Sequence, residues 1–94
     1  MPDLEEVLAE HGRTLGRVIA SYAPPGPERD DLAQDVAVAL LRALGGFRGE
    51  SSLRTYVLRV AHNQGARHAW RRRRRLRVEQ RPTEAEAPTG ERPD

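Results

Sequence analysis

Five residues in the second half of the chain repeat at the spacing of one helical face. They are Tyr56, Arg59, Asn63, Arg67 and Trp70, and on an α-helix they share an arc of about 80°. Aromatic rings stack on unpaired bases, Asn can make paired hydrogen bonds with a base edge, and Arg pairs with phosphate. This stripe predicts a nucleic-acid-binding face. A second interpretation stays open, in which the two aromatic residues belong to the core and the arginines are only solvated.

A dense run of arginines follows the stripe. Residues 71–81 contain seven Arg and a single acidic residue, Glu79. Such a block attracts a polyanion, which is nucleic acid, an acidic protein face or an anionic membrane. Next to the aromatic and amide residues, nucleic acid is the favoured partner. We therefore expect Arg71, Arg72 and Arg74 to contact phosphates.

A different kind of face is predicted for residues 27–44. On a helix, an arc of about 100° holds acidic, amide, apolar and basic side chains together: Asp31, Gln34, Asp35, Val38 and Arg42. Leu41 borders this arc. An apolar centre with a polar rim is the anatomy of a protein-binding patch. A solvated face that happens to include one valine is the alternative, and the residues alone do not decide between the two.

Residues that could support catalysis or hold a metal are not arranged for it. The chain has no cysteine, so neither a disulfide nor a thiolate metal site is available. His62 and His68 point about 120° apart on a helix, and His11 stands alone on an apolar stripe. The sequence contains no phosphate-binding glycine loop and no nucleophile elbow. We expect neither enzymatic activity nor a cofactor nor a metal.

Three helices must position these residues. The first is predicted to begin at Asp3, with Glu6 completing a capping box, and it carries the apolar stripe Leu4, Val7, Leu8, His11, Leu15, Val18, Ile19 and Tyr22. Pro24, Pro25 and Pro27 end it, and Pro27 begins the second helix, which stops at Gly45. The second helix should bury Leu32, Val36, Leu40, Ala43 and Leu44.

The third helix should be capped by Ser51 or Ser52 and should fray near Leu76. One of its faces should carry Leu53, Val57, Val60, Ala61 and Gln64. The predicted fold is all-α: a compact bundle of three main helices in residues 1–78. Residues 79–94 are acidic, contain proline and lack apolar periodicity, so they are predicted to be a disordered linker or tail. No apolar run approaches the roughly 20 residues that span a membrane, and a cytoplasmic protein is expected.

The stretch DDLAQDVAVALLRALGGFRGESSLRTYVLRVAHN resembles the second region of extracytoplasmic-function sigma factors. Those proteins have a D-x-x-Q-[ED] motif on one helix, an F-R-G-[ED]-[SA] loop, then T-W-x-x-R-I-A-x-N and an Arg-rich end. The resemblance covers roughly residues 4–77. Because several spaced motifs occur in the same order, it is more specific than any one of them. It implies a sigma region-two fold and a role in transcription initiation.

The resemblance also implies roles for individual residues. Asp31, Gln34 and Asp35 match the motif that docks on the clamp helices of the largest subunit of core RNA polymerase. The loop from Phe47 to Leu53 matches the segment that captures a base flipped out of the promoter minus-ten element, on the non-template strand; its expected DNA contacts are Phe47, Arg48, Gly49, Ser51 and Ser52. Tyr56, Arg59 and Asn63 match the helix that meets the melting junction. An anti-sigma factor is a further implied partner.

The sequence departs from the family pattern at three points. Tyr56 stands where the family usually has Trp, and Arg67 stands where Asp or Asn is common. The family also has a second helical domain that reads the minus-thirty-five element, for which this sequence shows no counterpart. We expect a domain of a longer protein, and a stand-alone single-domain factor is the alternative. Two other functions stay open: a general nucleic-acid-binding module that uses the arginines alone, and a sigma-like protein-interaction domain without promoter binding.

Overall fold

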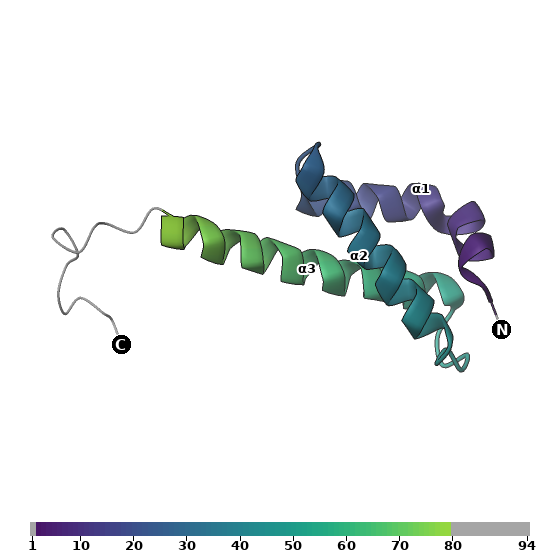
Figure 1. Cartoon of the computed structure of the whole chain (residues 1–94). Coiled ribbons are helices and arrows are strands. Elements are labelled where there is room, and N and C mark those ends of the chain that lie inside the picture. The colour runs from purple at the N-terminus through teal and green to yellow at the C-terminus, as the bar shows by residue number, and fades with distance from the viewer. Residues whose placement is uncertain (1, 80–94) are drawn as a thin grey trace, which may run out of the picture.

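The computed structural model describes residues 2–79 and contains three α-helices, α1 (Leu4–Tyr22), α2 (Pro27–Leu44) and α3 (Leu53–Glu79). Each helix contacts the other two, and α3 continues past both of them toward its C-terminal end (Figure 1). No strand occurs in residues 2–79. The predicted all-α bundle of three main helices is confirmed. None of the helices in this part of the chain is long and apolar enough to cross a bilayer.

The ends of the first two helices follow from local chemistry. The Asp3 carboxylate accepts a hydrogen bond from the Glu6 backbone N–H at 2.8 Å, so the predicted N-cap of α1 is formed. After Tyr22 the backbone becomes extended at Ala23, and Pro27 occupies the first turn of α2. Gly26, just before it, has φ of 120°, a value that residues with a side chain rarely adopt.

Arg29 links these two helix ends. Its Nε donates to the Ala23 carbonyl at 3.0 Å, and its Nη2 donates to the Ala20 carbonyl at 3.5 Å. The last turn of α1 contains no basic residue of its own. Its carbonyls, which have no partner within the helix, are therefore bound by an arginine of the neighbouring helix. Arg29 therefore fixes the turn between α1 and α2.

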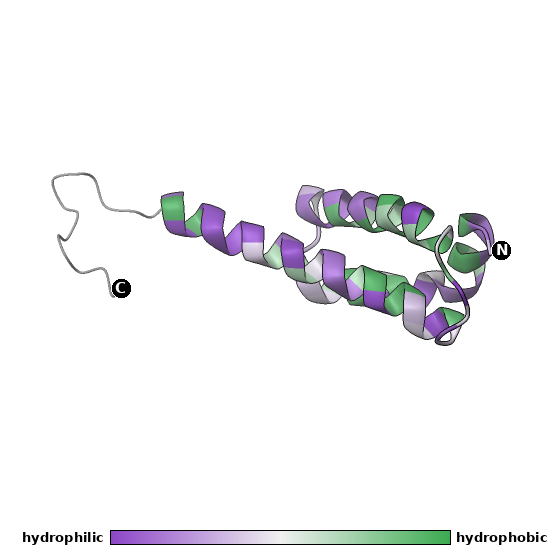
Figure 2. Cartoon of the chain, turned by 90° about the horizontal axis from the view of Figure 1, so that it is seen from below, coloured by the Kyte–Doolittle hydropathy of each residue, from purple (hydrophilic) through white to green (hydrophobic). Residues whose placement is uncertain are grey.

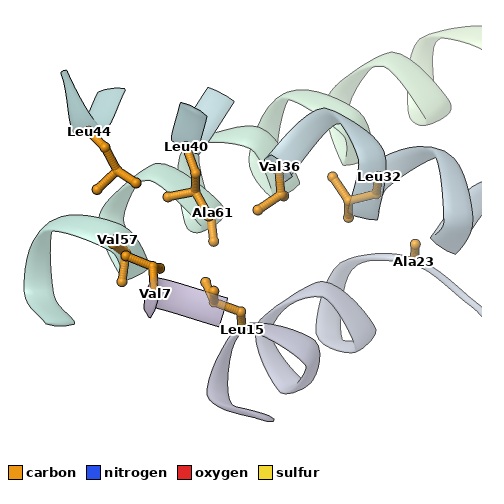
Figure 3. Packing of buried hydrophobic residues seen from close by; sticks show 9 residues of the cluster. All are labelled: Val7, Leu15, Ala23, Leu32, Val36, Leu40, Leu44, Val57 and Ala61. Atoms are coloured by element: carbon orange, nitrogen blue, oxygen red, sulfur yellow. The ribbon is translucent and has the colours of Figure 1, made fainter. Parts of the chain in front are cut away.

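The core is a single apolar cluster where the three helices meet (Figure 3). The second helix supplies the largest share, and the other members come from α1, the α1–α2 turn and α3: Leu32, Val36, Leu40, Leu44, Val7, Leu15, Ala23, Val57 and Ala61. The predicted buried face of α2 is confirmed at Leu32, Val36, Leu40 and Leu44, whereas its fifth predicted member, Ala43, is only half-buried. One predicted member of the α1 stripe is wrong: Leu8 is 44% exposed, because neither α2 nor α3 covers that edge of α1.

A glycine permits the closest helix contact. The ring of Tyr22 lies against Gly65 of α3, in the space that a Cβ atom at residue 65 would need. Gly12 and Gly16, both in α1, lie at no comparable helix contact. A Cβ atom at either position would meet open space, with no neighbouring atom within 4 Å. The close approach therefore depends on Gly65 alone among these three.

The third helix changes character along its length. Its buried residues are Val57, Ala61 and Gly65, whereas every residue from Arg73 to Glu79 is exposed. Figure 2 shows the hydrophobic colour concentrated where the helices meet, while the far part of α3 is mostly hydrophilic. The described part of the helix continues to Glu79, past the predicted fraying near Leu76, so Glu79, the first residue of the predicted tail, is helical. The rest of that predicted tail lies outside the described residues.

Candidate nucleic-acid and protein interfaces

The residues of the predicted protein-binding patch lie on the solvent-facing side of α2. Asp31, Gln34 and Arg42 are exposed, Val38 is 44% exposed and the neighbouring Leu41 is 62% exposed. Asp35 is half-buried, and its carboxylate lies 3.7 Å from Arg71 of α3. We call the set Asp31, Gln34, Asp35, Val38, Leu41 and Arg42 the α2 outer face. It combines two exposed apolar side chains with charged and amide neighbours, as a protein contact requires.

The loop between α2 and α3 is held at both ends. The Ser52 hydroxyl accepts a hydrogen bond from the Thr55 backbone N–H at 3.0 Å, so Ser52, and not Ser51, caps α3. At the other end, the backbone N–H of Phe47 bonds to the carbonyl of Leu44 at 3.3 Å. Gly49 has φ of 78°, which explains why glycine stands at the bend. The loop thus starts and ends in fixed positions.

Tyr56 lies under this loop. Its hydroxyl donates to the Ala43 carbonyl at 2.6 Å, and its ring packs on Phe47 with 4.8 Å between centroids. The sequence left open whether Tyr56 stacks on bases or belongs to the packed interior. The structure places it half-buried between α2 and the loop, with one edge toward the solvent-facing hollow described next. Tyr56 therefore lines this hollow and does not project from the surface as a stacking wedge would.

A cavity of about 180 Å³ lies between the loop and the start of α3. Its lining combines two aromatic rings, two arginines, an acid and a hydroxyl: Gly46, Phe47, Arg48, Glu50, Ser51, Tyr56 and Arg59. A cavity of roughly 150 Å³ holds one benzene ring, so this one has room for a single planar ring. The structure thus brings together five of the predicted DNA-binding residues, while Gly49 shapes the loop and Ser52 caps the helix. We call it the loop cavity.

Sequence reasoning missed two residues of the loop cavity. Glu50 stands inside the F-R-G-[ED] pattern, so its place in the motif could have marked it as a lining residue. Gly46 carries no such signal, because its contribution is backbone next to the cavity and not a side chain.

The rest of the predicted nucleic-acid stripe is exposed along α3. Arg59, Asn63 and Arg67 are accessible, and Trp70 is 52% exposed. The Arg74 guanidinium lies 4.9 Å from the centre of the Trp70 ring, a cation–π contact. Arg74 therefore continues the stripe one turn beyond Trp70. This outcome favours a surface role for Trp70 over the alternative that placed it in the core.

The arginines of residues 71–75 differ in whether they have an acidic partner. Arg72 Nε lies 3.0 Å from one carboxylate oxygen of Glu28, and Arg75 Nη2 lies 3.5 Å from the other. Together with Arg71 and Asp35, three arginines of α3 thus face acids of α2. The sequence had assigned Arg71 and Arg72 to phosphate. Their acidic partners lie about 40 residues earlier in the chain, so no local pattern could reveal the pairs.

Histidines and acids do not assemble into a metal site within residues 2–79. His62 Nδ1 lies 2.9 Å from the Tyr22 hydroxyl, so this histidine joins α3 to the end of α1 by a hydrogen bond. Its role is therefore accounted for by packing between helices.

Comparison with known proteins identifies the family. The model of the sigma-70 region 2 family matches residues 7–76. The RNA polymerase sigma-H factor of Pseudomonas aeruginosa is 36% identical over 69 residues, which cover 73% of this chain and 35% of that protein. The RNA polymerase sigma factor NccH of Alcaligenes xylosoxydans xylosoxydans is 29% identical over 59 residues, which cover 63% of this chain and 32% of that protein.

The chain spans about a third of the length of these curated relatives. No solved structure is significantly similar to it. The family match includes all of α2, the loop cavity and most of α3, and it begins inside α1. The chain belongs to the sigma-70 region 2 family and is a sigma-factor domain, not an enzyme.

Proposed function

We propose that this domain binds core RNA polymerase through the α2 outer face and recognises a promoter minus-ten element as melted single strand. We further propose that it comes from a sigma factor of the extracytoplasmic-function type, as its motifs suggest. The observation that carries the proposal is the loop cavity, which offers one ring-sized space beside the exposed Asn63 stripe in a chain of the sigma-70 region 2 family.

The loop cavity suits an unpaired base. Phe47 and Tyr56 supply aromatic surface, while Arg48, Arg59 and Ser51 supply hydrogen-bond donors at its edge. Extruding a base costs a few kcal/mol, and stacking returns about 1–3 kcal/mol per base. Capture of a base is therefore favourable only where the strand is already melted.

Asn63 lies one helical turn beyond Arg59 and is exposed. Its amide can both donate to and accept from a base edge. A strand with one base in the loop cavity would pass Asn63 next, so the two features can read neighbouring bases. Arg67 and Trp70 extend the same surface toward the arginine block.

Polymerase binding is proposed for the α2 outer face. Val38 and Leu41 are apolar and exposed on a helix whose opposite face is buried in the core. Both relatives are named as RNA polymerase sigma factors. An anti-sigma factor, the further partner implied by the resemblance, is a prediction for the same domain.

The test of polymerase binding is a pull-down of core RNA polymerase with the wild-type chain and two variants. Gln34→Ala and Asp35→Arg should both weaken capture, because both positions lie on the α2 outer face and neither is in the buried cluster. Glu10→Arg, a charge reversal at an exposed position of α1, is the matched control and should bind normally. Equal capture by all four proteins would contradict the proposed docking face.

The test of base reading is a fluorescence-anisotropy titration of single-stranded oligonucleotides with matched and scrambled minus-ten sequences. Asn63→Ala should cost about 1–3 kcal/mol of binding free energy on the matched strand and little on the scrambled one. Equal losses on both strands would favour a general nucleic-acid-binding module. Polymerase capture without any strand binding would favour a protein-interaction domain.

A further inference from the structure

Five of the arginines from Arg67 onward form two sets by direction, while Arg71 and Arg73 lie between the two sets. On an ideal helix Arg67, Arg74 and Arg77 share an arc of about 80° with Arg59 and Asn63. Arg75 and Arg72 lie about 120° and 180° from the middle of that arc. The two sets therefore face different surroundings, although they alternate in sequence.

The held set consists of Arg72 and Arg75, and Glu28 binds both. Each carboxylate oxygen of Glu28 faces one arginine, at 3.0 Å for Arg72 Nε and 3.5 Å for Arg75 Nη2. At the closer contact, Glu28 Oε1 and Arg72 Nε are both shielded from solvent, and the two form an ion pair whose angles fall short of a hydrogen bond. The rest of these side chains is partly solvated, since the Arg72 and Glu28 side chains are 40% and 35% exposed and that of Arg75 is 53% exposed. Salt therefore screens the contact at Arg75 more than the one at Arg72.

The outward set consists of Arg67, Arg74 and Arg77, and all three are exposed. Within residues 2–79 none of them forms an ion pair. From Arg59 to Arg77 the row extends about 27 Å along the helix. Arg74 lies over the Trp70 ring and remains exposed.

We propose that Glu28 is a specificity-determining residue: it withholds Arg72 and Arg75 from nucleic-acid phosphates and leaves the outward set to make those contacts. The inference rests on the proposed function, in that it assumes DNA binding by this domain. Phosphate contacts strengthen binding to every sequence alike, whereas base contacts favour the preferred one. By occupying two arginines, Glu28 limits how tightly the domain holds a wrong sequence.

The test uses the full chain and a random-sequence single-stranded oligonucleotide, with affinity measured by anisotropy at several salt concentrations. Each arginine that contacts a phosphate contributes about 0.7 to the slope of log affinity against log salt. Glu28→Gln should steepen the slope by about 0.7–1.4, because it releases one or both arginines. Asp30→Asn is the matched control, since it removes one negative charge from the same helical turn but has no arginine partner within the described residues. It should leave the slope unchanged.

A second pair of variants tests the division without touching Glu28. Arg74→Gln should flatten the slope by about 0.7, while Arg72→Gln should leave it unchanged. Circular dichroism checks that every variant keeps its helices. The division is overturned if Arg72→Gln and Arg74→Gln flatten the slope equally, or if Glu28→Gln behaves as Asp30→Asn does. Failure of base reading would show separately, as equal losses on matched and scrambled strands for Asn63→Ala.

Discussion

The region where the three helices meet and the region where α3 continues alone are built by different forces. In the first, α3 contributes Val57, Ala61 and Gly65, and burial against α1 and α2 decides which residues fit. In the second, from Arg73 to Glu79, every residue is exposed and the helix depends on backbone hydrogen bonding and on the propensity of Arg for helices. One continuous helix therefore combines a part fixed by packing against other helices with a part that depends mainly on its own backbone.

The ion pairs with α2 lie at the boundary between these regions. Arg71 and Arg75 are four residues apart, a spacing at which like charges on a helix repel each other. Asp35 faces the first and Glu28 faces the second, so acids of α2 offset that repulsion. The arginine-rich part of α3 is therefore not independent of the bundle. Its residues Arg71 and Arg75 are held to α2 by ion pairs.

The largest expected effect is a cavity in the region of packing. Leu40 is fully buried, so Leu40→Ala removes buried methyl groups and should lower the free energy of unfolding by about 2–5 kcal/mol. Urea titration followed by circular dichroism measures this loss. A loss below about 1 kcal/mol would mean that the cluster of Figure 3 is loosely packed.

A smaller effect, with opposite signs at two sites, is expected for glycine replacements. Gly65→Ala places a methyl group against the Tyr22 ring, and such overpacking costs about 1–3 kcal/mol. Gly12→Ala in α1 meets open space and should raise stability by about 0.5–1 kcal/mol through helix propensity. The same urea titration compares the two variants. If both gave a stabilised protein, the close approach of Tyr22 to α3 would be wrong.

The smallest effect is expected beyond the bundle. Leu76→Ala makes the same chemical change as Leu40→Ala at a position that is 38% exposed, and it should alter stability by less than about 0.5 kcal/mol. The ratio of the two losses measures the contrast between the regions directly. A loss at Leu76 comparable to that at Leu40 would show that the far part of α3 is covered by another segment of the chain.

Features decided by a few neighbouring residues were predictable from sequence. The Asp3 cap, the start of α2 at Pro27 and the buried face of α2 all follow from short-range rules, and all are observed. The nucleic-acid stripe could be located for the same reason, since its residues lie on one helix. Asn63 and Trp70 are exposed, as a nucleic-acid-binding face requires. Whether they bind nucleic acid is tested by the titrations proposed above.

Features decided by contact between distant segments were not predictable. Leu8 fits the apolar period of α1, but whether it is covered depends on where α2 and α3 lie. Tyr56 matches a stacking position, but the carbonyl that accepts its hydroxyl belongs to α2. Arg72 belongs to a basic run, but its charge is paired by an acid from another helix. In each case the residue type is compatible both with exposure to solvent and with contact to another helix. Only the three-dimensional arrangement decides which of the two occurs.

The position of Trp70 has a spectroscopic consequence. It is the sole tryptophan of the chain, and it lies half-exposed beneath the Arg74 guanidinium and away from the buried cluster. Its fluorescence emission therefore reports the environment of the outward arginine row in the folded protein. An unlabelled protein should reveal a bound strand by a change in this emission, because a base stacked on the indole or a displaced guanidinium alters the surroundings of the fluorophore.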